Sequence, residues 1–396
     1  MDTKETMDMA GKYLTQNYGR QPIALVKGKR CYVWDADGKK YLDFVTGLAA
    51  GNMGHCHPAV VAAVKKQLGE LWHTSNIYYT QPQAVYGKAL VESLYKGRVF
   101  FCNSGTEANE AALKLARRHS IENFSKERVD IIAFEGSFHG RTLGSLSLTG
   151  QLKYQQGFGP IPGAVKHVPF GDLEAVAKAV TKKTCAVFIE PVQGEIGVKV
   201  ANAKFIAGLA KLCADKKILL VFDEVQTGFG RTGKLFAYEH FKVKPDIITM
   251  AKGIANGFPM GAMFAKEEVA KSLVPGTHAA TFGGGPIACS GALAMLAEVK
   301  KPEILENARD LGRYALIRLN GLRQKIKTIK EVRGLGLMIG VEMAHPCAQV
   351  VADCAKNGLL VNCANQNTVR LLPPLDITRQ EMDRALSILG KALASS

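Results

Sequence analysis

The sequence has no uninterrupted apolar run long enough to cross a bilayer, which excludes a membrane-spanning helix. Its first residues, MDTKETMDMAGKY, lack the basic-then-apolar layout of a signal peptide, so we expect a cytoplasmic protein. None of its nine cysteines forms a C-x-x-C pair, and nine in 396 residues do not make a disulfide scaffold. We therefore expect reduced, mostly buried cysteines.

Acidic residues are fewer than basic ones: the chain has 35 Asp and Glu and 51 Lys and Arg, which gives a net charge of +16. Such an excess of basic residues is found in nucleic-acid-binding proteins, so a nucleic-acid-binding protein is the alternative to an enzyme. Here the basic residues are spread along the chain, and runs such as KKQ and DKKI are typical of solvated faces. We expect no nucleic-acid partner, and a positive field also suits an enzyme of anionic substrates.

Apolar runs of strand length alternate with helical patterns through the middle of the chain. They are VFFC (99–102), IIAFE (131–135), AVFIE (186–190), ILLVFDE (218–224), IITMAK (247–252) and GAMFA (261–265). Near-continuous apolar strands between helices predict a largely parallel sheet that is covered on both faces. A chain of this length also divides ordinarily into more than one domain.

The two ends of the chain have a different pattern. Residues 29–44 predict two short strands around the Asp37-Gly38 turn, and a helix begins at Pro58. After Gly283, long helical patterns precede VRGLGLMIGVEM, a further helix and a strand at Asn367–Leu372. We predict an α/β fold with an N-terminal segment (1–50) that joins the small domain, a large domain (51–285) and a small α+β domain (286–396).

Polar residues follow the strand at 99–102. Ser104 with Glu107 three places later is a capping box, and the small turn at Gly105 and Thr106 leads into a helix. A helix start of this kind presents free N–H groups to an anion. A well-capped helix without a ligand explains the same residues equally well.

An Asp and a Lys follow two other apolar strands. Asp223 ends one of them and needs a partner, such as a protonated pyridine nitrogen or a basic side chain in a structural salt bridge. Lys252 ends the next and is followed by small residues, so its pKa is expected to fall and its amine can form a Schiff base. Because ligands collect at the carboxyl ends of parallel strands, the combination favours pyridoxal phosphate, although a lone lysine is more often a surface residue.

Two other patterns suggest ligands that we reject. GFGRTGK (228–234) fits most of a P-loop, but Leu235 stands where a Mg²⁺-binding hydroxyl is needed, and neither this motif nor G-x-G-x-x-G follows its strand directly. His55-Cys56-His57 could suggest a metal, but adjacent side chains cannot all converge on one ion. A turn before the Pro58 helix is the better interpretation, and we expect no metal site.

Several segments together resemble the class-III aminotransferases, in order from about Tyr41 to beyond Arg370. They are SGTEANEAALKLAR (104–117), FHGRT (138–142), EPVQGEIGV (190–198), VFDEVQTGFGRTG (221–233), the Lys252 segment and THAATFGGGP (277–286). The resemblance implies the type I pyridoxal-phosphate aminotransferase fold. Within the family, GNMGHCHPAVV (51–61) and HTSNIYYTQPQ (73–83) are similar to the acetylornithine aminotransferase branch.

The resemblance implies a role for each site residue. Lys252 would carry pyridoxal 5'-phosphate and act as general base, while Asp223 would pair with its ring nitrogen. The other cofactor contacts would be Val225 and Phe138 on the two ring faces, Gln226 near the ring hydroxyl, Ser104, Gly105 and Thr106 at the phosphate, and Thr281 from a partner subunit. Arg141 and Arg370 would bind substrate carboxylates, and Glu195 would neutralise an arginine. Without the motifs, Phe138 and Val225 would be read as core and the arginines as surface ion pairs.

The implied reaction moves the terminal amine of N-acetylornithine to 2-oxoglutarate in a homodimer with shared active sites. Ala280 stands where close acetylornithine relatives usually carry a Ser or Thr, and Gly285 replaces the Asn of the usual G-G-N-P. Leu48 occupies the place where ornithine aminotransferases have a Tyr, which argues against free ornithine. A succinyl-diaminopimelate, ornithine or 4-aminobutyrate aminotransferase therefore stays an alternative. An aminomutase of the same fold is a further one, against which FHGRT and the two arginines count.

Overall fold

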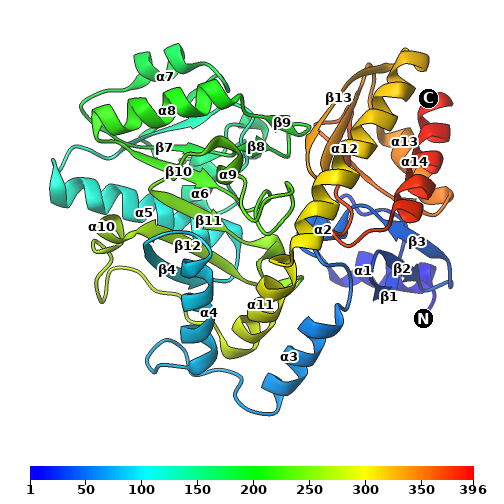
Figure 1. Ribbon diagram of the computed structural model, residues 1–396, viewed down its shortest axis with the longest axis horizontal. Helices are drawn as coiled ribbons and strands as arrows, with labels where there is room; N and C mark the ends of the chain where they lie inside the picture. The colour runs from blue at the N-terminus through cyan, green and yellow to red at the C-terminus, as the bar shows by residue number, and fades with distance from the viewer.

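The computed structural model describes all residues from Met1 to Ser396. Its largest layer is a seven-stranded sheet (Figure 1), with the strands in the spatial order β4 (Gly97–Cys102), β12 (Gly261–Lys266), β11 (Ile247–Met250), β10 (Leu219–Asp223), β7 (Thr184–Ile189), β5 (Asp130–Phe134) and β6 (Val165–Val168). Neighbours from β11 to β6 are parallel, and only β12 is reversed, since it pairs antiparallel with both β11 and β4. The other six strands therefore all have their carboxyl ends at the same end of the sheet.

Both faces of this sheet are buried. Ile131, Phe188 and Val221 belong to a core cluster with the apolar face of α5 (Gly105–Asn123). Alternate residues such as Ile132 and Leu220 point the other way and join the main core. The mostly parallel, doubly covered sheet is thus confirmed. The other helices of this part are α6 (Leu143–Leu148), α7 (Leu173–Ala179), α8 (Ala203–Lys216), α9 (Tyr238–Phe241) and α10 (Glu267–Ala270).

A smaller α+β part follows, as predicted. Its antiparallel sheet has the order β13 (Ile329–Leu335), β14 (Met338–Met343), β17 (Thr368–Leu371) and β16 (Asn362–Ala364), beside the helices α12 (Pro302–Lys325), α13 (Ala348–Lys356) and α14 (Arg379–Ala394) (Figure 1). The preceding helix α11 (Pro286–Val299) packs against α3 (Pro58–Leu68) and α4 (Gln81–Glu92). The domain boundary at residues 285 and 286 stays a prediction. No helix combines the length and apolarity that a membrane span needs.

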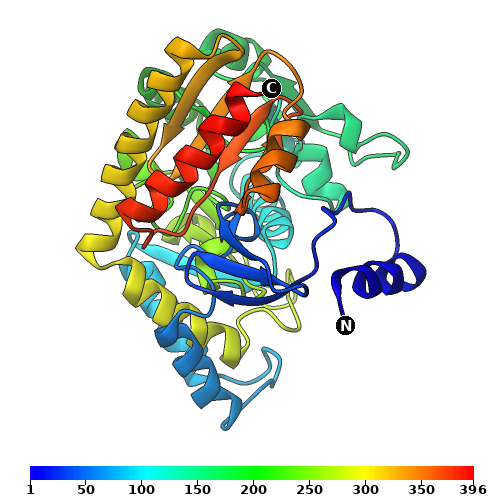
Figure 2. The same cartoon turned by 90° about the vertical axis from the view of Figure 1, so that its right-hand side faces the viewer.

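The N-terminal strands join the smaller part. The strands β1 (Leu25–Lys29), β2 (Tyr32–Asp35) and β3 (Lys40–Asp43) form a sheet, in which β3 pairs parallel with β15 (Leu359–Leu360). The predicted strand pair around Asp37-Gly38 is confirmed as β2 and β3. Ahead of them lies α1 (Thr3–Tyr13), which has no buried residue and lies at the periphery of the molecule (Figure 2), where the Thr3 N–H donates to Asp37 Oδ1 at 3.1 Å.

One cysteine pair corrects the expectation that all nine are reduced. Cys347 and Cys363 form a disulfide with a Cα–Cα separation of 6.1 Å. It joins the N-terminal end of α13 to β16, where the backbone N–H of Cys347 also donates to the carbonyl of Gln366. The two residues are 16 positions apart, so no short spacing motif indicated the bond. The other seven are free, and all except Cys56 are buried.

Candidate active site

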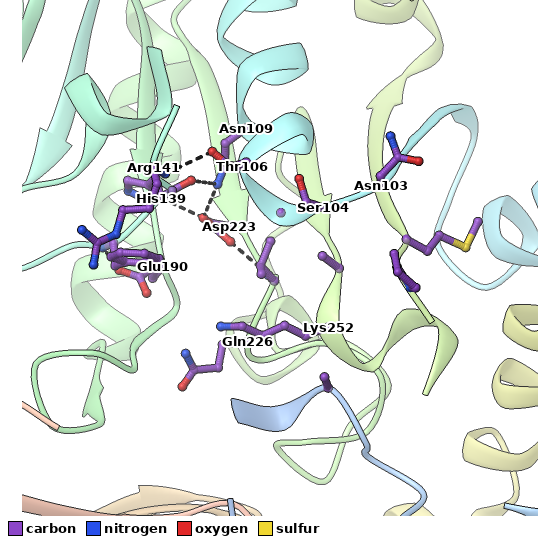
Figure 3. Close-up of a pocket in the computed structure, with 18 of the residues that line it drawn as sticks. Asn103, Ser104, Thr106, Asn109, His139, Arg141, Glu190, Asp223, Gln226 and Lys252 are labelled. Carbon is purple, nitrogen blue, oxygen red and sulfur yellow. Dashed lines mark hydrogen bonds and ion pairs between the residues drawn. The ribbon is translucent and has the colours of Figure 1, made fainter. Parts of the chain in front are cut away.

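A cavity of about 410 Å³ lies at the carboxyl ends of the parallel strands (Figure 3). That size accommodates a cofactor together with a small substrate. Of the predicted site residues, the strand ends bring nine into its lining: Ser104, Gly105, Thr106, Phe138, Arg141, Asp223, Val225, Gln226 and Lys252. Arg370, Glu195 and Thr281 do not line it, and each is described below.

The turn after β4 forms one wall. Ser104 is the N-cap of α5, and its hydroxyl accepts a hydrogen bond from the Glu107 backbone N–H. The Glu107 carboxylate accepts from the backbone N–H of Asn103 at 2.7 Å and from the Ser104 hydroxyl at 3.1 Å, rather than from the Ser104 backbone N–H, so the predicted capping box is shifted by one residue. The N–H groups of Gly105 and Thr106 have no acceptor within the protein. They are available to an anion at the positive end of a 19-residue helix.

The opposite loop closes tightly over this turn. The hydroxyl of Thr106 accepts from the backbone N–H of Arg141 at 3.2 Å and contacts the hydroxyl of Thr142 at 2.9 Å. A Cβ on Gly140 would lie 2.2 Å from the Thr106 Oγ1, and Gly140 has φ of 137°. The FHGRT loop can therefore reach Thr106 only with glycine at this position.

Asp223 is held in a buried polar network (Figure 3). Its Oδ2 accepts from Asn109 Nδ2 at 2.7 Å and contacts His139 Nδ1 at 2.8 Å, while Oδ1 accepts from the Val225 N–H at 3.0 Å. Burial alone would lower the pKa of His139, but the hydrogen bond and charge of Asp223 outweigh it and raise that pKa above its usual value. The carboxylate is thus fixed in position at the floor of the cavity.

Lys252 follows β11 and begins the short 3₁₀ helix η2 (Lys252–Ala255). Burial lowers the pKa of its amine below the usual value, and the nearby Arg370 acts in the same direction, while Glu195 opposes both. More of the amine is therefore unprotonated at neutral pH than in a surface lysine. An unprotonated amine is the form that attacks an aldehyde.

Two side chains line the space between these groups. Val225 lies close to the α5 turn, since a Cβ on Gly105 would be 2.8 Å from its Cγ1. Phe138 lines the cavity from the FHGRT loop. Both are half-buried rather than sealed in the core, so each offers an apolar surface to a ligand.

Arg370 is fully buried on β17 beside this cavity. Its Nη1 donates to Glu195 Oε1 at 2.8 Å, to Gln226 Oε1 at 3.0 Å and to the carbonyl of Gly194 at 3.1 Å. Burial acts to raise the pKa of Glu195, but Arg370 and Lys252 outweigh it and hold that pKa below its usual value. Gln226, which lines the cavity, contacts both Arg370 and Glu195, so it connects this ion pair to the cavity wall.

The three residues that we expect to depart from relatives lie outside the lining of this cavity. Leu48 is 39% exposed in α2 (Thr46–Ala49), a turn in which all four residues have positive φ. The carbonyl of Ala280 accepts from Asn76 at 2.9 Å, and Gly285 has an ordinary φ of −56° as the N-cap of α11. Thr281 is exposed and lines a second hollow with Phe282 and Asn103; Asn103 also lines the first cavity, but Thr281 does not.

Glu190 is a further carboxyl group in the lining, and sequence analysis gave it no role. Its Oε2 accepts the Phe138 N–H at 3.0 Å, and burial raises its pKa to about 8, against the effect of His139. At neutral pH this carboxyl is therefore mostly protonated and adds little negative charge to its wall of the cavity.

The rejected nucleotide and metal motifs have structural explanations. In the GFGRTGK segment, Arg231 is fully buried and donates to the carbonyls of Leu337 and Pro373 and to Asn52 Oδ1 at 2.6 Å. It joins the loop after β10 to the smaller part, and burial lowers its pKa to about 9. In the other motif, His55 Nε2 contacts Asp43 Oδ2 at 2.7 Å just before α3.

Sequence analysis missed Asn109 and His139. Asn109 lies four residues after Gly105, on the helix face that also carries Ala112 and Ala116, so a polar residue in an apolar stripe was an available signal. His139 stands inside the quoted FHGRT segment, but neither its spacing nor its neighbours indicated contact with Asp223 across 84 residues.

These features fit pyridoxal phosphate. Unpaired helix N–H groups suit its phosphate, the fixed Asp223 suits a ring nitrogen, the slot beside Val225 and Phe138 suits a flat ring, and the Lys252 amine suits an aldehyde. The site and fold therefore define a pyridoxal-phosphate-dependent transaminase.

Comparison with known proteins gives the family. A family model described as aminotransferase class-III matches residues 13–393, and the chain belongs to this family. The acetylornithine aminotransferases of Methanocaldococcus jannaschii and Caldanaerobacter subterraneus are 48% and 47% identical to it, over 99% and 97% of this chain and 98% of each relative. The solved ornithine aminotransferase of Toxoplasma gondii has a TM-score of 0.96 at 32% identity, with 100% of this chain and 96% of that chain covered.

Proposed function

We propose that the protein transfers the terminal amino group of N-acetylornithine to 2-oxoglutarate, which yields N-acetylglutamate semialdehyde and glutamate for arginine biosynthesis. Full-length relatives that are 43–48% identical carry the name acetylornithine aminotransferase. The observation that carries the proposal is that one of the two predicted carboxylate-binding arginines is already in an ion pair and the other is not. Arg141 faces the cavity with no ion pair, whereas Arg370 is already paired with Glu195 at 2.8 Å.

This difference between the arginines corresponds to the different number of carboxylates on the two substrates. N-acetylornithine has one carboxylate, for which the unpaired Arg141 suffices, and Glu195 then balances the charge of Arg370. 2-Oxoglutarate has two carboxylates, so Glu195 must release Arg370 to the second of them in a bidentate pair. Gln226, which contacts both Arg370 and Glu195, would have to move in the same step.

When bound, pyridoxal phosphate supplies an aldehyde for the amine and an electron sink for the substrate carbon. Gly105 and Thr106 would hold its phosphate through the helix N-terminus, with Ser104 fixing the turn. Asp223 would pair with its ring nitrogen, and Val225 and Phe138 would offer apolar surfaces to its ring. The Lys252 amine would be the group that holds the cofactor and the base that moves a proton of the substrate.

A donor panel tests the assignment. N-acetylornithine, ornithine, 4-aminobutyrate and N-succinyl-diaminopimelate are each offered with 2-oxoglutarate, and glutamate formation is measured. We expect kcat/KM to be highest for N-acetylornithine, by about 10-fold or more, since a single misplaced polar contact costs about 1–3 kcal/mol. A higher value for another donor contradicts the substrate assignment, and turnover without any 2-oxo acid indicates an aminomutase instead.

We also propose a homodimer with shared active sites. Large apolar side chains are exposed in one segment and a nearby loop: Trp72 at 65%, Ile77 at 81%, Tyr78 at 71% and Phe282 at 65%. Such a surface marks an interface, and a second copy would bring Thr281 to the phosphate of its neighbour. We propose a cytoplasmic location as well.

Light scattering tests the dimer. The wild-type protein is expected to have twice the mass of the chain, and Phe282→Glu is expected to shift it to the monomer and weaken cofactor retention. Leu152→Glu, at a side chain 73% exposed elsewhere on the surface, serves as the control and should stay dimeric. A wild-type monomer with full activity contradicts the proposal.

A further inference from the structure

The guanidinium of Arg141 is held by aromatic rings and by nothing else. Its carbon lies 3.9 Å from the ring centroid of Tyr154 and 5.5 Å from that of Phe138. The only hydrogen bond of Arg141 is made by its backbone N–H, and its side chain takes part in no ion pair although it is exposed. Tyr154 is therefore the closest support of this cation.

Tyr154 is itself fixed in place. It ends the short 3₁₀ helix η1 (Leu152–Tyr154), which is anchored by the glutamines on either side. The side-chain amide of Gln151 donates to the carbonyls of Gly136 at 3.2 Å and Ser137 at 3.3 Å. That of Gln155 donates to the carbonyls of Leu146 at 3.2 Å and Thr149 at 3.1 Å. These acceptors flank the FHGRT loop, so the ring is anchored to the same backbone that carries Arg141.

The same ring also contacts the Phe138 ring. The two centroids are 5.7 Å apart and the planes meet at 82°, an edge-to-face arrangement. Tyr154 is half-buried, and one side chain thus supports both the proposed cofactor-covering ring and the proposed carboxylate-binding cation. A change at Tyr154 can reach the substrate through Arg141 and the cofactor through Phe138.

Stacking suits a carboxylate receptor for a geometric reason. A guanidinium that lies flat on a ring uses its face for that contact and leaves its N–H edge free for a bidentate pair with a carboxylate. An ion pair would hold the side chain equally well but would occupy the same donors. A long exposed side chain without either support would lose more rotamer freedom when substrate binds.

We propose that Tyr154 is a positioning residue that holds Arg141 ready for a substrate carboxylate and so favours amine donors that have one. The inference rests on the proposed function, because that is where Arg141 receives its carboxylate. It adds a residue that does not itself line the cavity.

The test compares two donors that differ only in the carboxylate, N-acetylornithine and N-acetylputrescine. The change in cofactor absorbance is followed after rapid mixing, without 2-oxoglutarate. Tyr154→Leu is expected to raise the half-saturating concentration of N-acetylornithine about 5- to 30-fold, with the maximal rate changed less than about 2-fold. The same variant is expected to leave N-acetylputrescine unaffected. Tyr154→Phe keeps the ring face and should behave as the wild type.

A double-mutant cycle identifies the route of the effect. On an Arg141→Ala background, Tyr154→Leu should add no further loss with N-acetylornithine, because the cation that the ring supports is absent. The proposal is overturned if the effects of the two substitutions multiply, or if Tyr154→Leu weakens saturation equally with both donors. In either case the Tyr154 ring only packs against Phe138. Unchanged saturation by N-acetylornithine in Tyr154→Leu overturns it as well. Thermal melting and the cofactor spectrum verify that each variant is folded and loaded.

The two proposals fail in different ways. A wild-type protein that is inert toward N-acetylornithine contradicts the proposed function. The Tyr154 variants are then compared with the preferred donor of the panel and its decarboxylated counterpart, where the same pattern supports the inference and its absence overturns it.

Discussion

Lys252→Ala is expected to abolish transamination, with kcat reduced at least about 10⁴-fold. This is the upper range for removal of a general base, and it applies because the same amine is proposed to anchor the cofactor. The measurements are glutamate formation and the visible absorbance of the protein after dialysis. We expect the band of the lysine-bound cofactor to disappear even when pyridoxal phosphate is added again.

Lys234→Ala is the matched control, because Lys234 is an exposed lysine in the neighbouring GFGRTGK segment. It should keep both the absorbance and the turnover of the wild type. A Lys252→Ala protein with normal absorbance and activity would refute the assignment of this lysine, whatever the donor.

Asp223→Asn is expected to lower the rate of the donor half-reaction at least about 10²-fold, the scale for losing one aligned electrostatic contact in an active site. The amide cannot balance a protonated ring nitrogen, and His139 loses the carboxylate that it contacts at 2.8 Å. Stopped-flow absorbance gives the rate, and cofactor titration gives the dissociation constant, which should rise.

Asp246→Asn is the matched control, because it makes the same change at the amino ends of the parallel strands. Asp246 precedes β11, pairs with Lys266 at 2.7 Å and accepts from the Leu220 N–H at 2.8 Å. It should lower stability but leave the half-reaction rate of the folded protein within about 2-fold. If the two variants lose the rate equally, Asp223 acts through the fold and not at the ring.

The sheet could be predicted because its strands are buried on both faces. All six residues of β7 and all four of β11 are buried, so each appears in the sequence as a continuous apolar run. β6 was missed because VKHV lies at the edge of the sheet and alternates with polar residues. The reversal of β12 has no local signal, since an apolar strand looks the same in either direction.

The active site was predictable where a residue sits at a strand end or in a family motif. Asp223 and Lys252 are polar residues directly after apolar strands, and the structure places both in one cavity. Asn109, His139 and Tyr154 act through contacts made only after folding, with partners on other elements. Such contacts leave no periodicity in the sequence.

Arg231 links the unfolding of the two parts of the molecule. Its guanidinium has no carboxylate partner and depends on Asn52 and on the carbonyls of Leu337 and Pro373, which belong to the smaller part. If the smaller part detached, a buried cation would lose these acceptors, which costs several kcal/mol unless the surrounding loop opens to water as well. The loop also contributes Phe229 and Phe236 to the main core. Melting of the smaller part would therefore spread into the large sheet, and the chain would have a single cooperative unfolding unit.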